Sequence, residues 1–200
     1  QGTAGTLSDI GTTSFFPSKN LGGMGDGGAI FTNNDELAAK LRMFANHGQA
    51  KKYHFDAVGV NSRLDTLQAI ILRIKLRHLK DYSEKRYKAA LYYNDLLKDN
   101  PNFKTPIISE FSTHVFHQYT LQINDDIDRN ELQKGLKEKE IPSMVYYPIP
   151  LHLQNAYAYL GYKEGDLPIS EKLTKRVLSL PIHPEITKEQ IEFIVKALPK

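Results

Sequence analysis

Short apolar runs separated by turn residues make up the first part of the chain. Residues 12–16 and 27–32 are rich in β-branched, aromatic and small apolar side chains, which predicts two short buried strands. Apolar residues then recur at helical spacing as far as Phe44, and Asp35 is the expected cap of that helix. Residues 46–59 are mostly polar and predict a loop.

A much longer helical pattern begins at Leu64, from which apolar residues recur at steps of three and four. No Pro or Gly interrupts the chain between Arg63 and Pro101, so the periodicity runs on to Leu97. A single helix of that length would span roughly 50 Å at about 1.5 Å per residue. We therefore predict that it links two domains or bends.

The remaining residues predict a small α/β domain. The pattern consists of a strand at 117–123, a helix from Asp128 through Leu136, an extended stretch at 145–151, a helix at 170–178, a rigid connector at 180–184 and a last helix after the capping pair Thr187 and Gln190. We place the domain boundary inside the long helical pattern, so that residues 1–80 and residues 81–200 belong to different domains.

The composition argues against several classes of protein. The 200 residues carry a net charge of +3 without a dense basic run, and the mean hydropathy is −0.44, so we expect neither nucleic-acid binding nor a membrane span. The absence of cysteine excludes disulfides and thiol catalysis and fits a cytoplasmic protein. The first residues, Gln1 to Gly5, resemble a loop entering a fold already under way, so we expect the C-terminal part of a longer protein.

Lys19 is the most informative residue, because it lies in a turn between two predicted strands and precedes a glycine-rich run from Gly22 to Gly28. A lysine amine in a partly buried site can lose its proton and form a Schiff base with an aldehyde such as pyridoxal 5'-phosphate (PLP). The alternative is a solvated loop lysine. The glycine-rich run matches neither a P-loop nor a dinucleotide fingerprint, so we expect it to let the backbone pack close to the lysine.

Three more polar residues are candidates for binding an anion. The Ser14 hydroxyl can hydrogen-bond a phosphate, or it can simply pack in its strand. Asn61 precedes the long helical pattern, where Asn is also an ordinary cap. Arg63 offers a planar fork for a carboxylate or phosphate, unless it pairs with Asp65 or another surface carboxylate.

The seven histidines predict no metal site. His114 and His117 are three residues apart, but they fall in a loop and a strand and have no carboxylate partner at a helical step. No Gly-x-Ser-x-Gly elbow is present, so a Ser-His-Asp hydrolase is unsupported.

A series of motifs resembles the nucleotide-sugar aminotransferases of the DegT/StrS type. Those in the first part of the chain are Ser14-Phe-Phe-Pro-Ser-Lys-Asn-Leu-Gly22, Gly25-Asp-Gly-Gly-Ala-Ile30, His47-Gly48 and Gly59-Val-Asn-Ser-Arg-Leu-Asp-Thr-Leu-Gln-Ala69. Those in the second part are His117-Gln-Tyr-Thr120, Tyr146-Tyr-Pro-Ile-Pro-Leu-His152 and Leu180-Pro-Ile-His-Pro184. The resemblance covers essentially the whole chain in the order of the family.

The resemblance implies an α/β fold, the C-terminal part of a PLP-dependent transferase of the aspartate aminotransferase superfamily. Residues 1–80 would end a large, mostly parallel-sheet PLP-binding domain, and a long linking helix would lead to a small α/β domain at residues 81–200. The resemblance also implies a homodimer with active sites at the subunit interface.

The same resemblance implies roles for individual residues. Lys19 would hold PLP as an internal aldimine and later move protons between the substrate-derived carbon and the cofactor. Ser14 would bind the cofactor phosphate, and Asn61 would reach the phosphate of the neighbouring subunit's PLP. Lys19 also separates the chain from the family's dehydratase branch, in which His replaces the lysine.

The start of the chain departs from the family pattern. Family members carry an Asp that pairs with the pyridine nitrogen and, three residues later, a Gln. That Asp is not in the sequence, and the spacing from Gln1 to Lys19 is shorter than usual for the family's Gln. We therefore expect the 200 residues alone to be inactive and the parent chain to be active.

The resemblance implies transfer of an amine from glutamate to a nucleotide-linked keto-sugar for bacterial surface glycan synthesis. The motif versions look closest to members that act on UDP-linked 3-keto-hexuronic acids, where Arg63 would bind the sugar carboxylate. Tyr147 and His152 are further candidates for sugar contacts, although both can instead pack the domain junction. The alternatives are an aminotransferase for a neutral 4-keto-6-deoxy sugar and a non-catalytic binding or regulatory module.

Overall fold

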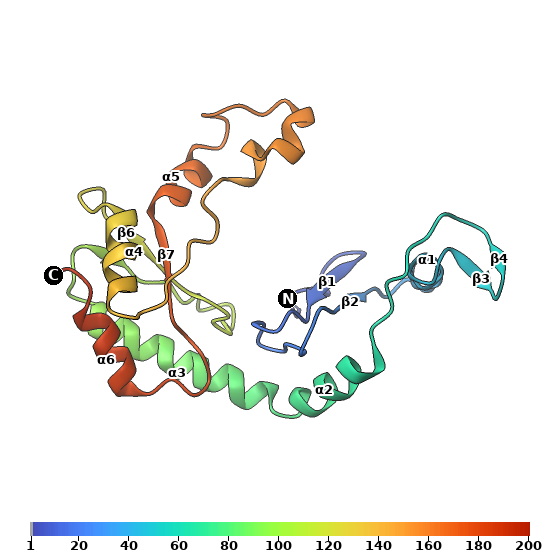
Figure 1. The fold of residues 1–200 in the computed structure, drawn as a ribbon, viewed down its shortest axis with the longest axis horizontal. Coiled ribbons are helices and arrows are strands. Elements are labelled where there is room, and N and C mark those ends of the chain that lie inside the picture. Colours follow the sequence, from blue (N-terminus) through green and yellow to red (C-terminus); the bar gives the residue numbers. More distant parts are fainter. Residues whose placement is uncertain (1) are drawn as a thin grey trace. The chain divides into compact units, whose positions relative to one another are not determined.

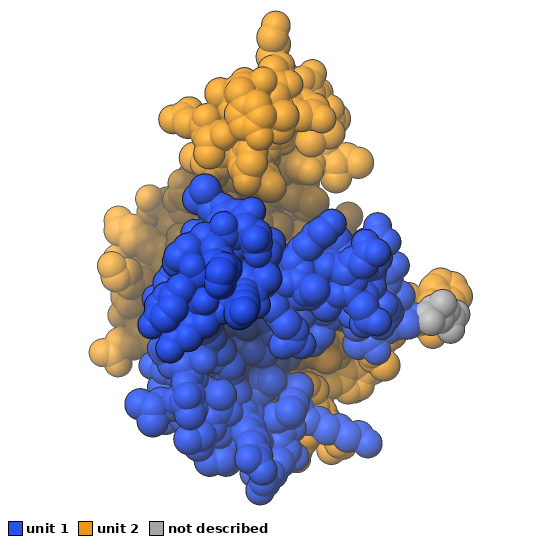
Figure 2. Space-filling model, turned by 90° about the vertical axis from the view of Figure 1, so that its right-hand side faces the viewer, with its two compact units in different colours: residues 1–80 blue, residues 81–200 orange. Residues whose placement is uncertain are grey.

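The computed structural model describes residues 2–200 of the chain. They form two compact units, residues 1–80 and residues 81–200, which Figure 2 distinguishes by colour. Along residues 2–200, no helix combines the length and the apolar character that a membrane crossing requires.

Unit 1 consists of two hairpins and two helices (Figure 1). The strands β1 (Gly11–Ser14) and β2 (Gly28–Phe31) pair antiparallel, close to the predicted ranges. The other elements are α1 (Asp35–Ala45), β3 (Gln49–Lys51), β4 (His54–Phe55) and α2 (Thr66–Leu76). All strand pairs among the described residues are antiparallel, so these residues do not form the mostly parallel sheet expected of the large domain.

The strands β1 and β2 are mostly exposed, not buried as predicted, and two further local predictions in unit 1 are wrong. The cap of α1 is Asn34, whose Oδ1 accepts a hydrogen bond from the Leu37 N–H at 3.0 Å, while Asp35 is already the first helical residue. The predicted loop at 46–59 contains the antiparallel pair of β3 and β4. Strands of three and two largely exposed residues carry no apolar alternation, so periodicity does not reveal them.

The long helical pattern is divided into α2 and α3 (Leu79–Leu97), so it does not form one continuous helix. At the end of α2 the Arg77 N–H donates to the carbonyl of Ile74 and the His78 N–H to that of Lys75. Each bond spans three residues instead of four, which tightens the last turn and ends the helix without Pro or Gly.

Unit 2 is built around a three-stranded antiparallel sheet in the order β5-β6-β7. Its strands are β5 (Phe103–Lys104), β6 (Tyr119–Ile123) and β7 (Val177–Leu180). Besides α3, its helices are α4 (Arg129–Glu138), α5 (Pro168–Arg176), α6 (Lys188–Lys196) and the 3-10 turns η1 (Leu151–Leu153) and η2 (Asn155–Leu160).

Strand β7 corrects the predicted helix at 170–178. Helix α5 ends at Arg176, and residues 177–180 pair with β6 as a buried strand. The apolar residues of this short run fit both the helical spacing of three to four residues and the alternation of a strand. Hydrogen bonding to β6 makes the run a strand. The capping box of Thr187 and Gln190 is confirmed, with the Gln190 N–H donating to Thr187 and the Thr187 N–H to the Gln190 side chain.

The core of unit 2 lies between α3 and the sheet. Tyr119, Leu121 and Ile123 alternate along β6 and are almost completely buried, as expected for the face of a sheet that is covered by helices. Tyr93 of α3 stacks on Tyr119, with ring centroids 4.6 Å apart. Unit 1 differs: Leu72 is its one buried large apolar side chain among residues 2–80, while Leu67 of α2 is 74% exposed.

Candidate active site

Lys19 lies in a tight turn that follows β1. The Phe15 N–H donates to the carbonyl of Gly27 at 2.8 Å, and the Gly23 N–H donates back to the carbonyl of Phe15 at 2.8 Å. Within this frame the Lys19 N–H bonds the carbonyl of Phe16 at 2.9 Å, and the lysine is half-buried. The turn therefore fixes the backbone from which the amine projects.

One glycine of the following run, Gly22, is required by close packing. A Cβ on Gly22 would lie against the carbonyl oxygen of Pro17 and 2.7 Å from that of Phe16, and a Cβ on Gly23 would lie 2.7 Å from Gln68 Oε1. Both separations are shorter than Cβ atoms tolerate. The atoms that face Gly22 are backbone oxygens, whereas the Gln68 side chain beside Gly23 can move aside. The predicted role of the glycine-rich run, close backbone packing beside the lysine, is therefore met at Gly22.

Helix α2 braces this turn from outside through two polar side chains. Gln68 Oε1 accepts a hydrogen bond from the Met24 N–H at 2.8 Å, and Lys75 Nζ donates to the carbonyl of Gly22 at 2.5 Å. Sequence analysis assigned neither residue a role. Gln68 and Lys75 are seven residues apart, which places both on one face of a helix that is otherwise rich in apolar residues. This spacing was the feature of the sequence that could have indicated a shared role.

Ser14 is the last residue of β1 and is exposed rather than packed. Its Oγ accepts a hydrogen bond from the Phe16 N–H at 3.2 Å, which orients the hydroxyl at the start of the lysine turn. Ser14 thus ends the strand that leads into the turn containing Lys19. A hydroxyl with a remaining donor is suited to binding an anion such as a phosphate.

Asn61 and Arg63 are held together beside the C-terminal end of α1. Asn61 forms a bridge with Asn46, and Asn46 Oδ1 accepts a hydrogen bond from Arg63 NH1 at 3.2 Å. The N-cap of α2 is Asp65, so Asn61 is not the cap of that helix. Arg63 is exposed, and among residues 2–200 no carboxylate forms an ion pair with it. No acidic side chain of the described residues therefore neutralises its charge.

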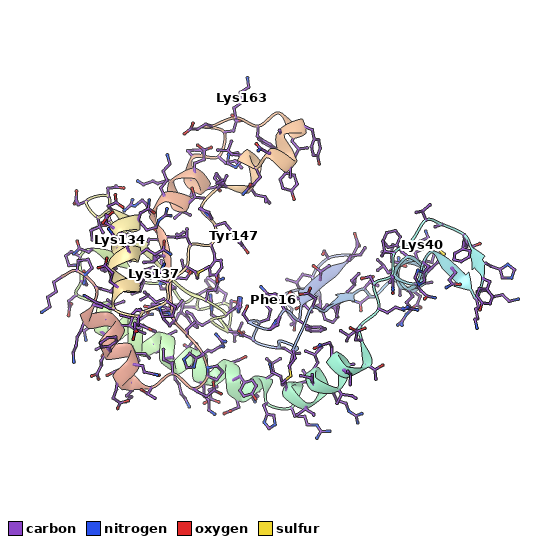
Figure 3. The ribbon with its side chains drawn as sticks, in the orientation of Figure 1. Phe16, Lys40, Lys134, Lys137, Tyr147 and Lys163 are labelled. Carbon is purple, nitrogen blue, oxygen red and sulfur yellow. The ribbon has the colours of Figure 1, made fainter. Side chains whose placement is uncertain are left out.

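Tyr147 lies in unit 2 on the irregular stretch between α4 and α5, where Figure 3 labels it. It is 69% exposed, and its ring meets that of Tyr146 edge-on with centroids 5.7 Å apart. The predicted extended stretch at 145–151 forms no strand: the backbone bends at Tyr146, Pro148 and Ile149, and η1 begins at Leu151.

His152 is buried in η1, and its Nε2 lies 3.0 Å from Glu171 Oε1. Glu171 also accepts backbone hydrogen bonds from Gly165 and Leu167. The Gly165 bonds, followed by the contact with His152, hold the pKa of the Glu171 carboxyl below its ordinary value, against the opposing effect of burial. Sequence analysis missed Glu171, whose only signal was an acidic residue in the first turn of a helix that begins with Pro168.

The candidate residues therefore form separate groups within each unit. Ser14 and Lys19 share one turn, Asn61 and Arg63 share the end of α1, and Tyr147 and His152 belong to unit 2. The candidate Gln1 lies outside the described residues. Within the described residues no group of three or more His, Cys, Asp or Glu side chains could hold a metal ion.

Two curated proteins are similar to this chain over nearly all of its length. The "pleiotropic regulatory protein" of Geobacillus stearothermophilus is 49% identical over 196 residues, covering 97% of this chain and 52% of that protein. The UDP-2-acetamido-2-deoxy-3-oxo-D-glucuronate aminotransferase of Pseudomonas aeruginosa is 45% identical over 192 residues, covering 96% and 52%. The chain thus spans about half the length of the curated relatives it matches.

Solved structures show the same relationship in three dimensions. DesV from S. venezuelae, in complex with a ketimine intermediate, superimposes with a TM-score of 0.88 at 39% identity, covering 96% of this chain and 51% of that one. The fold is therefore the mixed α/β fold of the C-terminal part of a PLP-dependent aminotransferase. The comparison with protein families matches residues 1–199. Together with the lysine turn, these matches show that the chain belongs to the DegT/DnrJ/EryC1/StrS aminotransferase family.

Proposed function

We propose that the full-length protein is a PLP-dependent nucleotide-sugar aminotransferase in which Lys19 is the catalytic lysine. The observation that carries this proposal is the braced turn that holds a half-buried lysine five residues after an exposed Ser14, whose hydroxyl accepts the Phe16 N–H. The wider family supports it, since a solved relative 32% identical to this chain holds pyridoxamine phosphate. As an enzyme of cytoplasmic nucleotide sugars it would serve bacterial surface glycan synthesis.

The residues present fit the proposed cofactor. Gly22 leaves no room for a Cβ beside the carbonyls of Phe16 and Pro17, so the backbone around the lysine turn is tightly packed, and the Ser14 hydroxyl is exposed before the turn. When bound, PLP supplies an electron sink for the carbanion that forms as an amine is moved. Lys19 would hold the cofactor, the Ser14 hydroxyl would donate a hydrogen bond to its phosphate, and the Lys19 amine would accept the proton removed from the amine-bearing carbon and return it.

The dimer is part of the proposal. Asn61 would reach the cofactor phosphate bound by the partner subunit, which requires two copies of the chain to share each site. Its exposure and its fixed position beside Asn46 are consistent with a contact across an interface. Glutamate is the proposed amino donor.

For the acceptor we propose a UDP-linked 3-keto-hexuronic acid, and the observation that favours it is Arg63. Its guanidinium is exposed, oriented by Asn46 and without a carboxylate partner among residues 2–200. A guanidinium in that state offers bidentate hydrogen bonds to a sugar C6 carboxylate. Tyr147, which is exposed, and His152, which lies close behind it in the chain, are the proposed further sugar contacts.

An absorption spectrum of the full-length protein with PLP tests the first part. A visible band that is present in wild type, absent in Lys19→Ala, retained in Lys40→Ala and bleached by glutamate is the expected result. Lys40 is the matched control because it is an exposed lysine on α1. A wild type without a Lys19-dependent band would leave the non-catalytic binding or regulatory module as the better interpretation.

A panel of keto-sugar nucleotides tests the acceptor. We expect Arg63→Gln to raise the KM for a UDP-3-keto-hexuronate about tenfold or more while changing the KM for a neutral keto-sugar less than twofold, since only the uronate presents a carboxylate. Equal losses on both substrates would reject the carboxylate role. A faster reaction of wild type with a neutral 4-keto-6-deoxy sugar would favour the alternative acceptor.

A further inference from the structure

The chain leaves the body of unit 2 between β6 and β7 to form an arm at residues 145–170 (Figure 1). None of residues 155–170 is buried, and Figure 3 shows Lys163 at the outer end of the arm. A segment with so few buried apolar contacts has little stability of its own. Its shape therefore depends on the hydrogen bonds that tie it down.

One carboxylate collects several of these hydrogen bonds. The Gly165 N–H donates to Glu171 Oε2 at 2.8 Å and to Oε1 at 3.0 Å, and the Leu167 N–H donates to Oε1 at 3.1 Å. His152 Nε2 lies 3.0 Å from the same Oε1. The side chains of His152 and Glu171 are only 6% and 13% exposed, so the pair is shielded from water and its bonds are strengthened.

This pair closes the base of the arm. The stretch that carries Tyr147 is held at one end by Met144, which exchanges backbone hydrogen bonds with Ser179 of β7 at 3.1 and 2.7 Å. At its other end it is held by His152 through Glu171. Residues 145–151 thus run between two fixed points, and the second of these depends on the Glu171 carboxylate.

We propose that Glu171 is a positioning residue for nucleotide-sugar binding, because its bonds to His152 and to the loop at Gly165 set the conformation of residues 145–151 and hence the place of Tyr147. The inference rests on the proposed function, since it takes the ligand to be a nucleotide-linked keto-sugar. Glu171 itself is not taken to touch the sugar.

Steady-state kinetics of the full-length protein test the proposal with Glu171→Gln. We expect the KM for the keto-sugar nucleotide to rise about tenfold, the loss typical of a charge-assisted hydrogen bond. We expect kcat and the bleaching of the PLP band by glutamate to stay within about twofold of wild type. Glu164→Gln is the matched control, because Glu164 is an exposed carboxylate next to Gly165 on the same arm, and it should match wild type.

A double variant tests whether Glu171 acts through Tyr147. If it does, Glu171→Gln combined with Tyr147→Ala raises the KM no further than Tyr147→Ala alone, because the two changes remove the same contact. Additive effects of the two substitutions would overturn the proposal. So would an unchanged KM in Glu171→Gln, or a parallel loss in the glutamate reaction and the sugar reaction.

Hydrogen exchange tests the positioning without any activity. The amides of the non-proline residues in 145–151, and those of Gly165 and Leu167, should exchange faster in Glu171→Gln than in wild type and Glu164→Gln, and unchanged exchange would overturn the proposal. Should Glu171→Gln not fold, Glu171→Asp retains the charge but shortens the reach. A missing Lys19-dependent band rejects the proposed function, whereas a normal band and a normal sugar KM in Glu171→Gln reject this inference alone.

Discussion

The Lys75 amine, on helix α2, donates a hydrogen bond to the carbonyl oxygen of Gly22 at 2.5 Å, in the turn that carries Lys19. The contact joins residues 53 positions apart and is partly buried. Lys75 thus holds the backbone of the turn through the Gly22 carbonyl. Lys19, in the same turn, is the lysine proposed to bind the cofactor. Gln68, on the same face of α2, holds the next part of the turn through Met24.

Replacing Lys75 with Met should loosen this turn. The substitution keeps most of the apolar stem and removes the donor to Gly22, which leaves a carbonyl without its charge-assisted bond. We expect the PLP dissociation constant of the full-length protein to rise about tenfold. Equilibrium titration of the visible band measures this, with Arg73→Met, an exposed site on the same helix, as the control expected to match wild type. If the PLP dissociation constant of Lys75→Met equalled that of wild type, Lys75 would not be needed to hold the turn for cofactor binding.

Replacing Gly22 with Ala should be more damaging. The added Cβ would lie against the carbonyl oxygen of Pro17 and 2.7 Å from that of Phe16, and neither backbone group can rotate away. We expect the turn to be displaced, with loss of the Lys19-dependent band and a cost of roughly 1–3 kcal/mol in the free energy of unfolding. Spectroscopy and urea denaturation measure the two effects.

Gly135→Ala is the matched control for that change. Gly135 lies inside α4, and a Cβ there has no heavy atom within 4 Å. Because Ala has the higher helix propensity, this variant should be more stable than wild type by about 1 kcal/mol with an unaltered spectrum. Equal behaviour of the two glycine variants would show that the contacts at Gly22 do not constrain the turn.

Arg86 should be important for the stability of unit 2. Its buried NH1 donates to the carbonyl oxygens of Phe116 and His117 at 3.3 Å each and of Ile182 at 2.9 Å, and burial lowers the pKa of the guanidinium. Arg86→Met leaves these carbonyls without their donor, so we expect unfolding to become easier by about 2–3 kcal/mol.

The neighbouring Lys85 supplies the comparison for Arg86. Lys85 is exposed and pairs with Asp81 at 2.8 Å, so solvent screens the pair and Lys85→Met should leave the unfolding free energy nearly unchanged. Urea unfolding followed by tyrosine fluorescence measures both variants. A similar small loss in Arg86→Met would mean that water replaces the guanidinium at the three carbonyls.

The arm should lose its order in acid. Because its hydrogen bonds lower the pKa of Glu171 below its ordinary value of 4.5, the stabilisation they provide is fully present above that value and is lost as the pH falls through the lower, folded-state pKa. Hydrogen-exchange protection of Gly165 and Leu167, measured as a function of pH, should follow this course. Glu171→Gln, which cannot titrate, should show little pH dependence, and protection that persists in strong acid would contradict the prediction.

Local patterns predicted the elements that local physics controls. The Thr187 capping box, the helix that follows Asp128 and the strand ending at Ile123 all appeared as expected, because each depends on residues within a turn or on simple alternation. Strand β7 was read as helix, since a short apolar run fits either period until β6 pairs with it. The break between α2 and α3 after Leu76 could not be predicted, because no Pro or Gly occurs there.

The sequence by itself determined the family and the identity of the candidate lysine, because the motifs that carry both are contiguous and their order along the chain is visible. Only the tertiary structure decided which side chains support the site. Arg63 meets Asn46, His152 meets Glu171 and Lys75 meets Gly22 across separations of 17, 19 and 53 residues. No local periodicity encodes such pairs, since they form only when the packing of whole elements brings distant polar groups within hydrogen-bonding distance.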